Sequence, residues 1–218
     1  MCLAFKEKIA NDDTYLSNLF FSDEASFHVN GRVNRHNSVI WGHSNPHVTR
    51  EVPIKSPSVC VWAGIYRDRV IGPFMFDSTV KAENYLEMLQ TFAIPEMKRL
   101  RRFSKTVFMH DGAPCHWANI TKCFLNTNFE NRWIGNNGPF HWAPRNPDLT
   151  PMDLIYFWGH IKAIVQKKAP TNMQDLKEAI RQAFEQVLRN NLDSAFRSFE
   201  KRLVLCISVD GSHFEQLL

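Results

Sequence analysis

The stretch Ser58–Tyr66, SVCVWAGIY, limits the possible folds of this chain more than any other feature. Its residues are apolar at both alternating sets of positions, so a strand formed here has to be covered on both faces. A polar tripeptide follows at 67–69, and Val70–Phe76 is again apolar, which predicts an antiparallel hairpin. A sheet that is covered on two faces requires helices on both sides, so we expect an α/β protein.

Strands and helices alternate along most of the remaining chain. Residues 1–14 are polar and mixed, and we interpret them as the remnant of an upstream linker, with residues 15–218 forming a single domain. The further strands that we expect are Tyr15–Phe21, which would end at residues 22–24, Thr106–His110, and the beginning of Gly138–Pro151. Apolar residues at spacings of three and four predict helices over Lys81–Arg102, after Pro114, from Thr150, from Thr171 and around Leu192–Leu203.

The composition is that of an ordinary globular protein, with 44% hydrophobic and 22% charged residues. The net charge of +4 permits binding to nucleic acid without requiring it. The 5 cysteines include no C-x-x-C pair, and no secretion signal precedes them, so we expect reduced thiols in an intracellular protein. No apolar run reaches the roughly 20 residues of a membrane helix.

Three aspartates stand at the ends of predicted elements. Asp23 and Asp111 each follow an expected strand, and Asp153 lies in the first turn of the helix after the last strand. In open α/β sheets, binding sites gather at the carboxyl ends of strands. Carboxylates that converge repel one another, by about 4 kcal/mol for two unit charges 4 Å apart at an effective dielectric near 20, and therefore need a proton or a cation. Oxygen ligands suit Mg²⁺ or Mn²⁺, and two such ions can stabilise the attacking and leaving oxygens of a phosphoryl displacement.

Each acid also has a purely structural explanation. Asp111 could cap the helix that follows it, Asp153 could belong to a T-x-x-D cap, and Asp23 could lie in a turn. Two further acids, Glu24 and Asp148, lie near the proposed ligands. Glu24 alternates with Asp23 and should face the other way in a strand, and Asp148 should cap a turn, so neither is expected to be a ligand.

Four segments together resemble the catalytic domain of Tc/mariner-type transposases, particularly copies of the insect type. They are FFSDEASFHVNGRVNRHNSVIWGHSNPH, VCVWAGIYRDRVIGPFMFDSTVKAENYLEMLQ, HDGAPCH and WAPRNPDLTPMDLIYFWGHIK. The resemblance covers nearly the whole chain from about Tyr15. One departure is the interval between Asp111 and Asp153, which is longer than in better-known mariner elements; RWIGNNGPFHW fills the difference.

The resemblance implies a ribonuclease-H-like fold, a mixed five-stranded sheet flanked by helices. It implies that Asp23, Asp111 and Asp153 are catalytic and hold two Mg²⁺ or Mn²⁺ ions for DNA cleavage and transfer of the 3′-OH ends. It further implies DNA as the partner, a homodimer, and a nuclear location. Full-length relatives begin with helix-turn-helix modules, which we expect this chain to lack.

Several basic residues and one histidine are candidates for DNA contact. They are Arg32 and Arg35 in the polar segment 28–57, Arg101, Arg102 and Lys105 at the end of the helix 81–102, and His116 after the second acid. Basic clusters usually form solvated faces, and His116 could instead orient a ligand or lie in the core.

Two other functions stay open from the sequence. A catalytically inactive relic of a transposon could bind DNA or a protein, and an unrelated metal-dependent phosphohydrolase could use the same acids. The chain contains no Gly-rich phosphate loop that would supply a nucleotide site.

Overall fold

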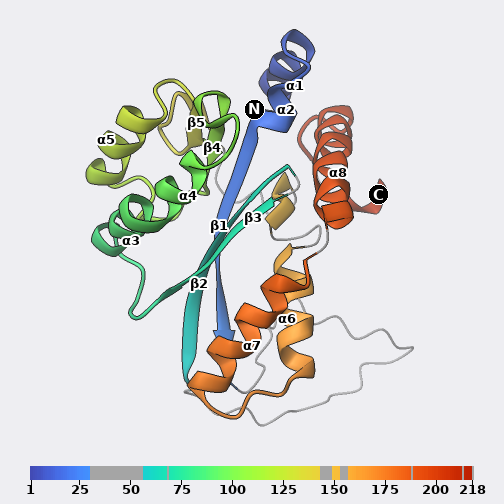
Figure 1. Ribbon diagram of the computed structural model, residues 1–218. Helices are drawn as coiled ribbons and strands as arrows, with labels where there is room; N and C mark the ends of the chain where they lie inside the picture. Colours follow the sequence, from blue (N-terminus) through green and yellow to red (C-terminus); the bar gives the residue numbers. More distant parts are fainter. Residues whose placement is uncertain are drawn as a thin grey trace.

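The computed structural model describes residues 1–29, 56–67, 69–142, 149–152, 157–187, 189–212 and 214–217, and its ribbon is drawn in Figure 1. Within these ranges a six-stranded sheet has the order β3-β2-β1-β4-β5-β6. The strands are β1 (Leu19–His28), β2 (Ser58–Tyr66), β3 (Arg69–Phe76), β4 (Val107–Met109), β5 (Trp133–Gly135) and β6 (Phe140–His141). The first three are antiparallel, whereas β4, β5 and β6 run parallel to β1. The predicted α/β class and the hairpin are confirmed. The short β6 corresponds to the strand expected at the beginning of Gly138–Pro151, and β5 is a sixth strand beyond the five expected.

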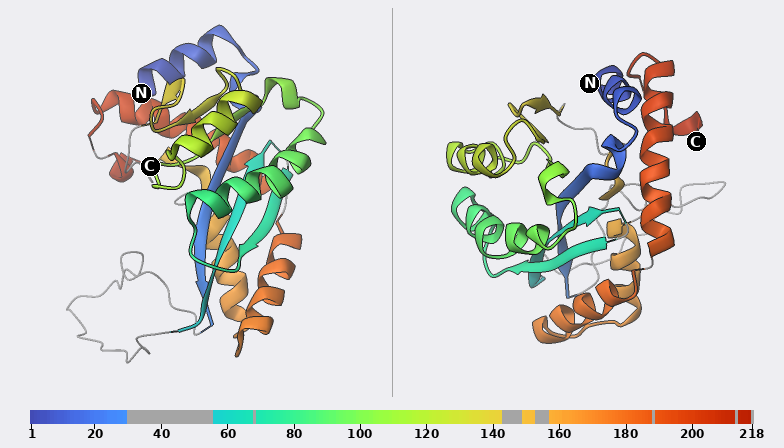
Figure 2. Two further views of the ribbon diagram at one scale, coloured as in Figure 1. Left: turned by 90° about the vertical axis from the view of Figure 1, so that its left-hand side faces the viewer. Right: turned by 45° about the horizontal axis from the view of Figure 1, so that its top comes forward.

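Helices cover both faces of this sheet, as Figures 1 and 2 show. On one side lie α3 (Ala82–Met88), α4 (Ile94–Lys98) and α5 (Asn119–Asn128), and on the other lie α1 (Cys2–Asn11), α6 (Phe157–Lys167), α7 (Met173–Glu185) and α8 (Arg189–Ser208). The short helix α2 (Tyr15–Asn18) leads into β1. None of the helices in the described ranges combines the length and the apolar character that crossing a bilayer demands.

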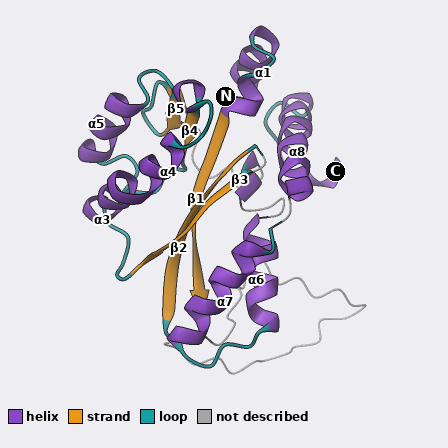
Figure 3. Cartoon of the chain, viewed as in Figure 1, coloured by secondary structure: helices purple, strands orange, loops and turns teal. Residues whose placement is uncertain are grey.

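The central strands divide their side chains between two apolar cores. On β2, Val61, Ala63 and Ile65 belong to the core under α6, α7 and α8, while Trp62 and Tyr66 belong to the core under α3, α4 and α5. Burial on both faces is what the apolar pattern of Ser58–Tyr66 predicted. The long β1 and β2 strands stand between the two helical layers in Figure 3.

The first strand differs from its sequence prediction. Residues 15–18 form α2, and β1 begins at Leu19 and continues to His28, so the expected end at residues 22–24 is wrong. The reason is the antiparallel partner: β2 pairs with β1 from Phe20 to His28 and extends it past the acids. Asp23 therefore lies in the middle of a strand instead of at its end.

The segment 1–14, which we expected to be linker, contains helix α1. Its Phe5 is fully buried and contacts the rings of Phe140, Trp142 and Phe199 edge-on. Helix α1 thus contributes to the core beside α8.

Two helical predictions need refinement. The helix expected over Lys81–Arg102 contains a π-helical turn, Leu89–Ala93, immediately before α4. Pro95 explains it, because proline lacks an N–H and its ring displaces the carbonyl four residues earlier. Helix α5 begins only at Asn119. The spacing of Trp117 and Ile120 predicts that they face the core, but both are exposed, and the buried residues of α5 are Thr121 and Leu125.

Candidate metal centre

The pairing of β1 with β4 places the first two acids at neighbouring positions. The parallel register joins Phe21 to Met109, and both Asp23 and Asp111 lie two residues beyond this pair. The hydroxyl of Ser22 donates to the carbonyl oxygen of Met109 over 2.8 Å, which holds the strands together beside the acids. Two aspartates that are far apart in the sequence therefore lie on adjacent chain segments, Asp23 within β1 and Asp111 two residues past the end of β4.

Asp23 is a buried carboxylate, with only 8% of the residue exposed. Its Oδ2 accepts a hydrogen bond of 2.8 Å from Nε1 of Trp158, on α6. Trp158 is itself buried and packs against the rings of Phe27, Phe157 and Phe184. A buried carboxylate needs such donors, and helix α6 supplies one to Asp23.

Asp111 follows β4, where the chain leaves the sheet. Its Oδ1 accepts from the backbone N–H of Ala113 at 3.0 Å and lies 2.6 Å from Nδ1 of His116. Burial acts to raise the pKa of Asp111, but the hydrogen bond and charge of His116 outweigh it, and the pKa falls below its ordinary value. The side chain is 48% exposed, and its Oδ2 accepts from no described residue. One carboxylate oxygen is thus anchored while the other is available.

His116 joins two carboxylates. Its side chain is 1% exposed; Nδ1 faces Asp111, and Nε2 lies 3.2 Å from Oε2 of Glu24. Burial opposes protonation of His116, but the Tyr85 phenol, the Glu24 carboxylate and the hydrogen bond to Asp111 raise its pKa well above the usual range. The surroundings therefore favour the protonated form of the imidazole, and each ring nitrogen lies within ion-pair distance of a carboxylate; Nδ1 also lies 3.3 Å from the backbone carbonyl oxygen of Asp111.

Two neighbouring rings pack against this imidazole. The ring of His110 stacks on it at 4.6 Å with an interplanar angle of 14°, and the ring of Tyr85 lies at 4.4 Å. Burial and the charge of His116 hold the pKa of His110 well below its usual value, so His110 stays neutral and interacts with the Tyr85 hydroxyl through Nδ1 at 3.2 Å. Gly135 on β5 makes room for His110, because a Cβ there would lie 2.6 Å from Nε2.

The structure groups the acids differently from the sequence prediction. Among the described residues, one group of potential ligand atoms lies within 4.8 Å of one another, and it consists of Glu24, Asp111 and His116. Asp23 is not a member, since its carboxylate accepts from Trp158. Asp153 lies outside the described residues. Glu24 faces away from Asp23, as expected, but it thereby points toward His116, a contact that alternation along a strand does not reveal.

The expected DNA contact by His116 does not fit its position. The side chain is buried and both of its nitrogens face protein carboxylates, so it cannot reach a phosphate in solvent. It also lies in a turn before α5, not within a helix.

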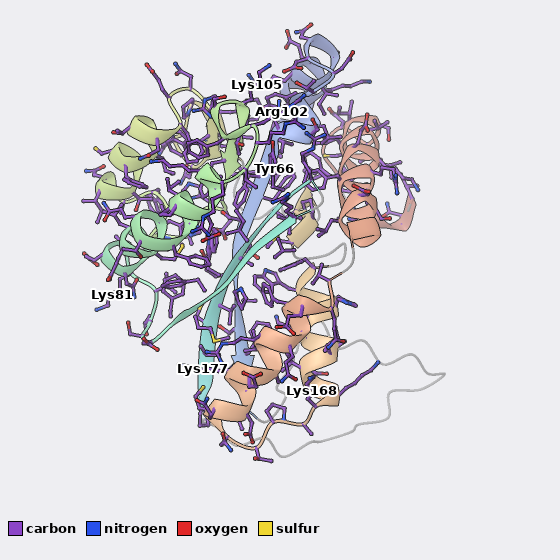
Figure 4. The ribbon with its side chains drawn as sticks, viewed as in Figure 1. Tyr66, Lys81, Arg102, Lys105, Lys168 and Lys177 are labelled. Atoms are coloured by element: carbon purple, nitrogen blue, oxygen red, sulfur yellow. The ribbon has the colours of Figure 1, made fainter. Side chains whose placement is uncertain are left out.

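The basic candidates lie away from Asp111. Arg101, Arg102 and Lys105 are exposed and precede the amino end of β4, whereas Asp111 follows its carboxyl end. Figure 4 shows Arg102 and Lys105 beside the end of the molecule that carries α1. The other predicted contacts, Arg32 and Arg35, lie outside the described residues, as does Asp148.

The strand order, with an antiparallel hairpin on one side of β1 and parallel strands on the other, and the acids on β1 and after β4 define the class: an α/β domain of the ribonuclease-H-like type. The chain matches no protein-family model. It is 26% identical to the Tc3 transposase of Caenorhabditis elegans over 93% of its own length and 59% of that protein. It therefore spans about three fifths of this curated relative.

Solved structures agree on the fold. The Mos1 transposase catalytic domain with raltegravir and Mg superposes with a TM-score of 0.72 at 20% identity, covering 98% of this chain and 93% of that one. The Mos1 paired-end complex with the left transposon end gives 0.73 at 18% identity, covering 98% and 61%. The chain is thus similar in sequence to the Tc3 transposase and shares the fold of the Mos1 catalytic domain.

Proposed function

We propose that this chain is a divalent-metal-dependent DNA transposase domain, which cleaves phosphodiester bonds and transfers the 3′-OH ends to target DNA. The observation that carries the proposal is the register of β1 and β4, which sets Asp23 beside Asp111 within a fold shared with the Mos1 catalytic domain. The Tc3 relative is a transposase, and Mos1 structures include complexes with Mg, with Mn and with transposon-end DNA.

The residues present suit a hard divalent cation. The Asp111 side chain is 48% exposed and its Oδ2 accepts from no described residue, and the Asp23 carboxylate lies at the neighbouring strand position with a hydrogen bond from Trp158. Oxygen ligands of this kind favour Mg²⁺ or Mn²⁺. The imidazole of His116 lies between the Asp111 and Glu24 carboxylates, which raise its pKa.

We propose Asp23, Asp111 and Asp153 as the ligands of two Mg²⁺ or Mn²⁺ ions. When bound, such ions supply charge stabilisation for the attacking and the leaving oxygen of the phosphodiester. The protein's own part is to present ionised carboxylates. An aspartate is ordinarily ionised at neutral pH, and His116 lowers the pKa of Asp111 further, so protons compete with a cation for this carboxylate only at more acidic pH.

The partners follow from the same function. We propose that Arg101, Arg102 and Lys105 contact DNA phosphates at a distance from the acids, and that Arg32 and Arg35 contribute from the segment outside the described residues. Contacts of this kind weaken steeply as salt rises. A homodimer that acts in the nucleus completes the proposal.

Nicking of supercoiled plasmid DNA in the presence of Mn²⁺ tests the function. Asp111→Asn should abolish nicking, because it removes the ligand charge while keeping the shape of the side chain. Asp193→Asn, at an exposed acid on α8, is the matched control and should nick like the wild type.

Thermal unfolding with and without Mn²⁺ adds a second measurement, since a cation that binds only the folded state raises the Tm. Undiminished nicking by a folded Asp111→Asn variant would falsify the metal assignment. A Tm that does not change when Mn²⁺ is added would favour the inactive relic. Faster turnover of a small phosphate ester than of DNA would favour the phosphohydrolase.

A further inference from the structure

Two adjacent acids of β1 point to opposite faces of the sheet and make different contacts. Asp23 accepts from Trp158, and Glu24 contacts His116. We propose that His116, anchored by Glu24, is a positioning residue that fixes the Asp111 carboxylate for the cation, and that Glu24 is not itself a ligand. The inference rests on the proposed function, because it assigns roles around the same metal centre.

The first step concerns the orientation of Asp111. Rotation of an aspartate about its last side-chain bond is soft, so an isolated carboxylate samples many orientations. Here Oδ1 is held from two directions, by the N–H of Ala113 at 3.0 Å and by Nδ1 of His116 at 2.6 Å. The plane of the carboxylate is thereby set, and Oδ2 remains for a cation. Partners that orient metal ligands in this way commonly change metal affinity about 10- to 100-fold when they are lost.

The second step concerns His116 itself. A histidine can bind a metal only through a ring nitrogen with an available lone pair. Both nitrogens of His116 face carboxylate oxygens, at 2.6 Å and 3.2 Å, and the ring packs against the rings of Tyr85 and His110. One cation could not take a lone pair from this ring without breaking one of the two contacts. The geometry therefore favours a positioning role over a place among the ligands.

The third step concerns Glu24. Its carboxylate is the second anchor of the imidazole, and without it His116 would be held from one side only. A glutamine at this position keeps an oxygen that accepts from Nε2, whereas an alanine does not. The two substitutions therefore distinguish the roles of Glu24. If Glu24 were a metal ligand, its negative charge would be needed and Glu24→Gln would lose Mn²⁺ affinity. If it only anchors His116, the acceptor oxygen kept in Glu24→Gln is enough.

Mn²⁺ affinity measured by isothermal titration calorimetry, without DNA, is the primary test. His116→Ala should lower the affinity about 10- to 100-fold. His116→Asn, whose amide can occupy the place of Nδ1 and donate to Asp111, should recover at least part of that loss. Glu24→Gln should bind Mn²⁺ within about threefold of the wild type, and Glu24→Ala should lose about tenfold. His141→Ala, at an exposed position of β6, is the matched histidine control and should bind normally.

The outcomes separate this inference from the proposed function. If the wild type binds Mn²⁺ but does not nick DNA, the proposed function is wrong, and the Mn²⁺ affinities of the His116 and Glu24 variants still test the positioning role. Affinity that is unchanged in His116→Ala overturns the positioning role, and so does Glu24→Gln binding as poorly as Asp111→Asn, which would make Glu24 a ligand. Lack of Mn²⁺ binding by the wild type overturns both. If His116→Ala does not fold, His116→Asn and Glu24→Ala carry the test, with thermal unfolding as the check on folding.

Discussion

Trp158 and Asp23 join helix α6 to the middle of β1 through a hydrogen bond of 2.8 Å from Nε1 to Oδ2. The two residues are 135 positions apart in the chain. Trp158 follows closely on Asp153, so the helix that carries this donor begins near the third proposed acid. A single contact thus ties the first acid to the part of the chain that is expected to deliver the third.

Replacement of Trp158 by phenylalanine removes this donor while keeping most of the buried ring. We expect Trp158→Phe to destabilise the fold by about 1.5–3 kcal/mol, the usual range for a hydrogen bond to a charged group, and to weaken Mn²⁺ binding. Trp133→Phe is the matched control, because its Nε1 donates over the same 2.8 Å to the neutral amide oxygen of Asn126. It should cost about 0.5–1.5 kcal/mol and leave Mn²⁺ binding unchanged. Urea unfolding and calorimetry measure both, and equal effects on Mn²⁺ affinity would contradict the role of Trp158.

Helix α1 should contribute strongly to stability through one side chain. Phe5→Ala empties a fully buried site among aromatic rings and should cost about 3–5 kcal/mol of the free energy of unfolding. Leu3→Ala, on the same helix with 69% of the side chain exposed, should change it by no more than about 0.5 kcal/mol. Denaturant unfolding distinguishes the two. A loss for Phe5→Ala as small as that for Leu3→Ala would show that α1 is not part of the stable core.

Gly64 on β2 has to remain a glycine because of the aromatic packing beside it. A Cβ at this position would lie 2.1 Å from Cζ of Phe20, whose ring stacks between Trp62 and Phe108. Gly64→Ala should therefore destabilise the protein by at least about 1–3 kcal/mol. Gly159→Ala, in helix α6 where a new methyl would meet nothing within 4 Å, should instead stabilise it by up to about 1 kcal/mol. Thermal unfolding should give a lower Tm than the wild type for Gly64→Ala and a higher Tm for Gly159→Ala.

Cys2 and Cys206 bring the first helix and α8 within reach of a covalent link. Their sulfurs are 3.4 Å apart and reduced. We expect diamide to oxidise the pair to a disulfide, with the two thiol protons and two electrons passing to diamide, and the crosslink to stabilise the fold by about 2–4 kcal/mol. Burial raises the pKa of Cys2 to about 12, so the reactive thiolate is scarce at neutral pH and oxidation through Cys2 should speed up as the pH rises toward that value. Peptide mapping identifies the bond, and Cys206→Ser is the control. Stabilisation by diamide in Cys206→Ser would show that another cysteine is responsible.

The sequence alone determined the features that depend on local pattern. The two-sided apolar run of Ser58–Tyr66 required a sheet covered on both faces, and the structure has one. The spacing of apolar residues in the helix from Thr150 predicts a buried stripe of Leu154, Phe157, Trp158, Ile161 and Val165. The last four are buried on α6, and Leu154 lies outside the described residues. Periodicity carries such information because burial of one face repeats with the geometry of the helix or the strand.

Only the tertiary structure decided the contacts around the acids. Glu24 and His116 are 92 positions apart, and Trp158 and Asp23 are 135 apart, so no local pattern relates them. The length of β1 could not be predicted from the sequence either, because it depends on the pairing with β2. Which acid accepts from which donor depends on the strand register and on the direction of each side chain where β4 leaves the sheet. Those quantities exist only once the two cores have packed, because packing between distant segments is what sets them.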